Sequence, residues 1–114
     1  MKRIMLCALA CLLLIGCGGK PSGMSDEMYD TGIYVVDVVD AYLDGTNTLE
    51  YTYDLISSVN VPECEDVWGK DWDVSAHILY VEIALSGMKP TIQTSTISDL
   101  KEKRNELADI LNYK

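Results

Sequence analysis

An apolar segment at the start of the chain limits how many residues remain to form a folded domain. After a basic start, the residues from Ile4 to Ile15 are apolar, and small Gly16 precedes Cys17. This order is typical of an export signal with a small residue at its cleavage site. The apolar run is 14 residues long up to the cysteine, whereas a membrane-spanning helix needs roughly 20. We therefore expect residues 1–16 to be a cleaved signal peptide.

The last four residues of this segment, Leu14-Ile15-Gly16-Cys17, closely resemble the lipobox of bacterial lipoproteins. In that class the signal is cut before the cysteine, which carries lipid as the first residue of the mature protein. The resemblance implies lipidation of Cys17 and a location on the exported side of the bacterial cell envelope, anchored to the membrane. A plain signal peptide or an uncleaved anchor is the alternative. Residues 17–24 would be the lipidated cysteine and a flexible Gly-rich tether, and residues 25–114 an acidic helical domain.

The charge of the chain is strongly negative and unevenly distributed. The full sequence has 9 basic and 18 acidic residues; removing the two bases of the signal leaves seven bases and a net charge of −11. Between Asp26 and Glu82 there are fourteen acids and one base, Lys70. We expect no nucleic-acid partner, because binding nucleic acid needs Lys and Arg to neutralise phosphates. A cationic protein or peptide is the favoured partner.

Of the four cysteines, only Cys64 lies in the mature domain away from the lipid site, so it cannot pair within its own chain. Its neighbours Glu63, Glu65 and Asp66 disfavour the thiolate form. We therefore expect a structural rather than a reactive cysteine.

Apolar residues recurring at spacings of three and four predict four helices. The first covers about residues 25–44, with Ser25 as its N-cap. The β-branched residues within 33–39 make a strand the alternative there. Asn47 and Glu50 have the spacing of a capping box for a second, shorter helix through Val59.

A third helix is expected from a cap at Asp71 or Asp73 to Ser86, and it is apolar almost all round. Such a helix is normally central and buried; a buried strand over residues 78–85 is the competing prediction. Thr96 or Ser98 caps the last helix. Short links between four helices indicate an all-α fold, a small four-helix, up-and-down type bundle.

Two tryptophans among acids form the candidate binding site. Trp68 and Trp72 lie near Asp66, Asp71 and Asp73. Aromatic rings amid carboxylates can hold a cationic group through attraction to the ring face and through charge. The alternative is that the indoles close one end of the core, since a small domain without Phe needs its large aromatic side chains for burial.

The other polar residues do not indicate a catalytic or metal-binding site. Asp37, Asp40 and Asp44 share one helix face but lack the spacing of a calcium loop, so we interpret them as a solvated face. His77 is the only histidine and is expected to be a hydrogen-bonded core residue. We predict no enzyme, no cofactor and no metal site.

These observations favour a non-catalytic binding or interaction module of the cell envelope, held at the membrane by the lipid on Cys17. One alternative is a passive accessory subunit of an envelope complex, which would expose a contiguous apolar patch. The residues considered for that patch are Tyr34, Tyr42, Tyr51 and Tyr53. The other alternative is a protein that binds a cation or small ligand.

Overall fold

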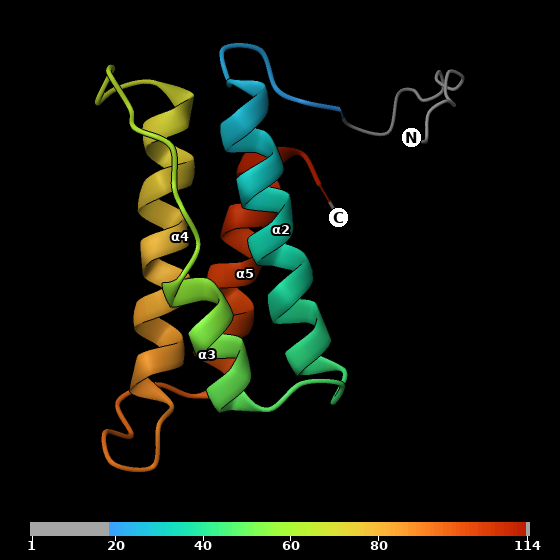
Figure 1. The fold of residues 1–114 in the computed structure, drawn as a ribbon, viewed down its shortest axis with the longest axis vertical. Coiled ribbons are helices and arrows are strands. Elements are labelled where there is room, and N and C mark those ends of the chain that lie inside the picture. The colour runs from blue at the N-terminus through green and yellow to red at the C-terminus, as the bar shows by residue number, and fades with distance from the viewer. Residues whose placement is uncertain (1–18, 114) are drawn as a thin grey trace.

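The computed structural model describes residues 19–113, which form four α-helices joined by loops (Figure 1). The helices are α2 (Asp26–Leu43), α3 (Leu49–Ser57), α4 (Lys70–Gly87) and α5 (Ile97–Leu111). No strand occurs in the described part of the chain. The prediction of an all-α four-helix fold is therefore confirmed, and the strands considered over residues 33–39 and 78–85 are excluded.

The helices alternate in direction, and the three long ones carry most of the packing. Figure 1 shows α2 and α4 running one way along the molecule and α3 and α5 running back. α4 packs along α5, α2 contacts both of them, and the short α3 contacts α2 and α4. The bundle is thus a three-helix core with a fourth, shorter helix set against two of its members.

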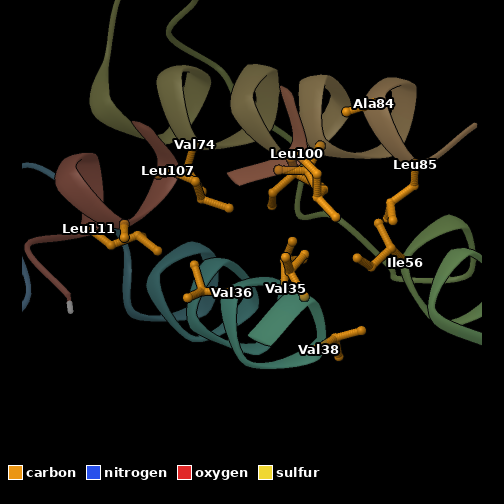
Figure 2. Close-up of a cluster of buried hydrophobic side chains, with 14 of the residues drawn as sticks. Val35, Val36, Val38, Ile56, Val74, Ala84, Leu85, Leu100, Leu107 and Leu111 are labelled. Carbon is orange, nitrogen blue, oxygen red and sulfur yellow. The ribbon is translucent and has the colours of Figure 1, made fainter. Parts of the chain in front are cut away.

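Aliphatic side chains from all four helices meet in one core (Figure 2). α2 contributes valines such as Val35 and Val36, α3 contributes Ile56, and α5 contributes a row of leucines. Full burial of such a side chain stabilises the fold by roughly 1.5–3 kcal/mol. This packing outweighs the strand preference of the β-branched residues in α2. Met24 is also buried, at 2% exposure, so the core reaches into the stretch expected to be tether.

The ends of α2 and α5 are capped as the sequence predicts. The Ser25 hydroxyl accepts a hydrogen bond from the backbone N–H of Met28 at 3.1 Å. Thr96 and Asp99 form a capping box, in which each side chain accepts the other's backbone N–H. A cap satisfies backbone donors that the first turn of a helix leaves unpaired.

The caps predicted for the two middle helices are wrong. Thr48, not Asn47, caps α3 by accepting from the Tyr51 N–H at 3.1 Å. α4 begins before the predicted caps, after Gly69 and without a side-chain cap. Asp71, one of those predicted caps, lies inside the first turn and accepts a hydrogen bond from the Ser25 N–H at 2.9 Å.

On the acidic face of α2, Asp37 and Asp44 are exposed, as expected for a solvated face, whereas Asp40 is half-buried against α5. Asp40 accepts two hydrogen bonds from the Arg104 guanidinium, at 2.8 Å from Nε and 2.9 Å from Nη2. Asp37 accepts a hydrogen bond from the Tyr113 hydroxyl at 2.8 Å. The helical spacing does gather these acids, but the partners are 64 or more residues away in sequence, so sequence spacing could not reveal them.

The third helix is central, since α4 contacts all three other helices, but the prediction that it is buried is wrong for one of its sides. α4 buries Val74, Ile78, Val81 and Leu85, while Leu79 is 52% and Ile83 57% exposed. Neighbouring helices cover only one side of α4, so an apolar residue on the opposite side remains in solvent.

His77 is hydrogen-bonded, as expected, but it is not buried in the core. It is half-buried on α4, with its Nδ1 2.8 Å from the carbonyl oxygen of Asp73. Its ring meets Tyr80 edge-on, with the ring centroids 5.0 Å apart. The expectation of a core histidine is therefore wrong in location, because this side of α4 turns away from the core. Across residues 19–113, no helix is long and apolar enough to cross a bilayer.

Candidate functional site

The end of the bundle where the chain enters also carries the predicted binding residues. The segment before α2 and the loop before α4 lie at the same end of the molecule (Figure 1). The hydrogen bond from the Ser25 N–H to Asp71 joins them. Lys20 is fixed nearby, because its Nζ donates to the Met24 carbonyl at 2.6 Å and lies 3.3 Å from Asp26 Oδ1. We call this region, residues 20–25 and 63–72, the entry end.

A shallow acidic depression of about 300 Å³ lies at the entry end. Its lining includes four acidic residues: Glu63, Glu65, Asp66 and Asp71. Gly23, Gly69 and Lys70 complete the lining. Carboxylates gathered around a concave surface raise the local concentration of cations and cationic groups. The structure therefore brings Asp66 and Asp71 together, as the candidate set proposes, and adds two glutamates of the loop.

Trp68 stands out from this loop into solvent, with 91% of it exposed. The turn that presents it is held by two hydrogen bonds to Asp66. The Trp68 N–H donates to Asp66 Oδ1 and the Gly69 N–H donates to the Asp66 carbonyl, both at 3.0 Å. The alternative in which this indole closes the core is therefore excluded. The adjacent Val67 is 46% exposed.

Trp72 and Asp73 follow Asp71 in the first turn of α4 and point away from the depression. Successive residues of an α-helix are rotated by about 100°, so Asp71, Trp72 and Asp73 leave the helix on three different sides. Trp72, 44% exposed, lines a groove along α4 that includes Ala76. Asp73 is exposed and does not line the acidic depression. Of the five candidate residues, the depression joins only Asp66 and Asp71, with Trp68 on the turn beside them.

Cys64 lies under the same loop, half-buried, with its Sγ 3.8 Å from the Pro62 carbonyl oxygen. Burial raises the pKa of this thiol, and the carboxylate of Asp71 raises it further. Both effects favour the unreactive thiol form. The sequence pointed to acids adjacent to the cysteine as the cause, but the structure shows burial as the larger cause.

A larger hollow of about 550 Å³ lies at the opposite end of the molecule, between α3 and the loop after α4. Lys89 spans it, with Nζ 3.7 Å from the centre of the Tyr53 ring. This is a cation–π contact between the loop and the helix. Sequence reasoning missed the pair because its members are far apart in the chain. Within residues 19–113, no group of three or more His, Cys, Asp or Glu side chains could hold a metal ion.

These observations define a small acidic helical bundle with an exposed indole beside its acidic depression. Comparison of the chain with protein-family models, with curated proteins and with solved structures gives no match.

Proposed function

We propose that this chain is a bacterial lipoprotein, anchored in the cell envelope by lipid on Cys17, that binds a cationic protein or peptide without catalysing a reaction. The lipobox-like ending of the signal segment supports the anchor. The acidic depression and Trp68 support the binding role. A lysine or arginine side chain entering the depression would gain from its carboxylates, and its neighbour could lie on the exposed indole.

The observation that carries this proposal is the exposure of Trp68. A large apolar side chain that is 91% exposed contributes little to folding, so its burial on a partner is available as binding energy. Tryptophan and arginine are enriched among the residues that dominate interface energies. The surrounding acids select for a basic partner.

The position of the site suggests a partner close to the membrane. Lys20 is already fixed to the domain by its contacts with Met24 and Asp26. Only three residue steps separate it from Cys17, which amounts to about 10 Å of fully extended chain. The entry end of a lipidated molecule would thus lie next to the bilayer surface.

Intrinsic fluorescence tests the binding role directly because the chain has only two tryptophans. In a Trp72→Phe variant, Trp68 is the sole indole. Titration with a lysine-rich peptide should shift its emission to the blue and give saturable binding that weakens as salt rises. A glutamate-rich peptide should leave the emission unchanged. A lysine-rich peptide that also leaves it unchanged would refute the binding role.

Matched charge variants locate the site. The double substitution Glu63→Gln and Glu65→Gln should weaken binding about fivefold, from roughly 0.5 kcal/mol for each exposed ion pair. The control, Glu27→Gln with Glu50→Gln, removes the same net charge from exposed positions on α2 and α3. Equal weakening by both pairs would mean that net charge, rather than the depression, attracts the peptide.

The anchor has a separate test that does not depend on the binding role. The wild-type chain expressed in a bacterium should incorporate labelled palmitate and sediment with membranes. A Cys17→Ser variant should lose the label and leave the membrane fraction. Labelling that persists in the variant would refute the assignment of Cys17.

A second candidate, an assembly subunit, is supported by exposed apolar residues on a different part of the surface. Tyr42 and Tyr53 pack against the core, which leaves Tyr34 and Tyr51 as exposed members of the tyrosine set. The exposed apolar residues that follow one another along a single face are on α4. This face is the feature that a subunit of an assembly would use.

A further inference from the structure

The solvent side of α4 carries a continuous apolar stripe, which we call the outer face. Its members are Trp72, Ala76, Leu79, Tyr80 and Ile83. The four large side chains are 42–57% exposed. The core residues of the same helix, such as Val74 and Val81, are rotated roughly half a turn away at 100° per residue. α4 therefore has two apolar sides, and only one is covered by this chain.

The spacing of the outer face is that of a helix-packing seam. Residues 72, 76, 79, 83 and 86 follow one another at alternating intervals of four and three. This is the repeat by which apolar residues of paired helices interlock as knobs into holes. Grooves of about 410 Å³ and 370 Å³ border the outer face, one near Val61 and the other beside α5. A ridge of side chains between two grooves suits a second helix.

We propose that the outer face of α4 binds the outer face of a second copy of this chain, with the two α4 helices antiparallel and Leu79 at the centre. This inference goes beyond the peptide-binding role and does not depend on lipidation. Two-fold symmetry requires a self-complementary surface, and the order of large and small residues along α4 provides one.

Size complementarity selects the antiparallel arrangement. With Leu79 opposite its own copy, Trp72 of one helix faces Ser86 of the other, and Ile83 faces Ser75 next to Ala76. Large side chains thus meet small ones on both sides of the central Leu79 pair, which is how packed interfaces fill space. A parallel pair would instead oppose Trp72 to Trp72 and Ala76 to Ala76, giving a clash at one level and a void at the next.

Charge complementarity points the same way. Asp73 lies two helical turns before Tyr80, on the same side of α4. Lys103 of α5 lies near that side, with Nζ 6.0 Å from the Tyr80 ring centre and 3.6 Å from Glu106 Oε1, an ion pair that a partner's acid would share. Antiparallel pairing brings the acidic beginning of one α4 toward the lysine-bearing side of the other, and it also aligns the helix dipoles favourably. Parallel pairing would place acid against acid.

The available area is sufficient for a dimer of modest affinity. Four side chains of roughly 200 Å² each, about half exposed, offer ~400 Å². The small residues between them and the stems of flanking charged residues raise this to ~500 Å² per copy, or ~1,000 Å² in total. That is the lower limit for a specific interface, so we expect reversible dimers rather than a permanent complex.

The lipid anchors are compatible with this geometry. A two-fold axis perpendicular to the bilayer would place both entry ends at the same height, with the two α4 helices parallel to the membrane plane. Both copies could then remain anchored in one leaflet.

Sedimentation measurements of mass against concentration test the proposal. The domain from Gly19 onward is suitable because its buried core lies within residues 24–111, and it avoids micelles formed by the lipid. Its mass should rise toward twice the monomer mass at submillimolar concentration. Leu79→Lys should keep it monomeric, whereas the control Ile92→Lys, at a position of similar exposure in the loop after α4, should still dimerise. Both sites are exposed, so circular dichroism should show a native fold in each variant.

Disulfide trapping tests the orientation in a Cys64→Ser background. Leu79→Cys should crosslink to itself under mild oxidation. Trp72→Cys should crosslink when mixed with Ser86→Cys, and neither of these should crosslink alone. A wild-type domain that stays monomeric at all concentrations overturns the proposal and leaves the outer face for a different helical partner. Dimers in which Trp72→Cys crosslinks to itself overturn the antiparallel arrangement.

Discussion

The ion pair between Asp40 and Arg104 offers the sharpest test of how the bundle is held together. It joins the last turn of α2 to α5 through two charge-assisted hydrogen bonds, with side-chain exposures of 42% for Asp40 and 17% for Arg104. We predict that Asp40→Asn destabilises the domain by about 1.5 kcal/mol. The substitution preserves the shape of the side chain, removes its charge and can retain a single hydrogen bond to the guanidinium.

The magnitude follows from the partial burial of the pair. Breaking a buried ion pair by removing one partner costs about 3–5 kcal/mol, while a fully exposed pair contributes about 0.2–1 kcal/mol. Arg104, which is mostly buried, resembles a residue of a buried pair, and the more exposed Asp40 resembles a residue of a surface pair. The amide keeps part of the hydrogen bonding, which places the expected cost between these limits. For a domain of this size, about 1.5 kcal/mol corresponds to a fall in melting temperature of roughly 6–12 °C.

Thermal and urea unfolding followed by circular dichroism measures the effect. The control is Asp30→Asn, which removes one charge from an exposed position on the same helix and should change the unfolding free energy by less than about 0.5 kcal/mol. A double-mutant cycle with Arg104→Gln isolates the pair itself. A coupling energy below about 0.5 kcal/mol, or equal loss in the control, would refute the reasoning that burial strengthens this pair.

Three further predictions concern other parts of the fold. The hydrogen bond to Asp37 raises the pKa of Tyr113 from 10.0 to about 12. The stability that this hydrogen bond contributes is therefore present below pH 10 and is lost as the pH rises to about 12. Urea unfolding across this pH range measures the loss. Gly87→Ala should cost about 1–2 kcal/mol in thermal unfolding, because a Cβ there would collide with the Ser95 hydroxyl. Iodoacetamide should alkylate Cys64 more slowly than a free cysteine at mildly alkaline pH, because burial raises its pKa.

Each of these predictions has an internal control. A Tyr113→Phe variant should lose less stability between pH 10 and 12 than the wild type, and an equal loss in both would assign the alkaline effect to other groups. Ser86→Ala, one residue before Gly87, should be nearly neutral; equal destabilisation would mean that the loop does not depend on the glycine. Alkylation of Cys64 should reach the free-cysteine rate in denaturant, and a fast rate in the native protein would contradict its burial.

Much of the fold could be predicted from the sequence because its signals are local. The three-and-four spacing of apolar residues gave four helices, and the caps at Ser25 and Thr96 lie within three residues of the N–H groups that they satisfy. Where several capping residues compete, sequence is less decisive. Thr48 caps α3 where Asn47 was predicted, because the backbone geometry decides which side chain can reach the first turn.

The candidate site was predictable only in part, for a geometric reason. The sequence places Trp68, Trp72 and three aspartates within eight residues, but closeness in sequence does not fix direction. α4 begins at Lys70, so residues before it follow the turn at Asp66 while those after it rotate around the helix axis. Trp68 thus lies beside the acidic depression, and Trp72 belongs to the outer face.

The sequence by itself determined the helical class of the domain, its acidity and its lipobox-like start, since each depends on residue types and short spacings. Only the tertiary structure decided which apolar residues are buried. A helix that is apolar all round is covered completely only if neighbours surround it, and α4 has neighbours on one side. That arrangement leaves Leu79 and Ile83 in solvent. The folded chain also pairs Asp40 of α2 with Arg104 of α5, and Asp37 with Tyr113 just beyond α5. Such partners lie far apart in the chain, so only the folded arrangement brings them together.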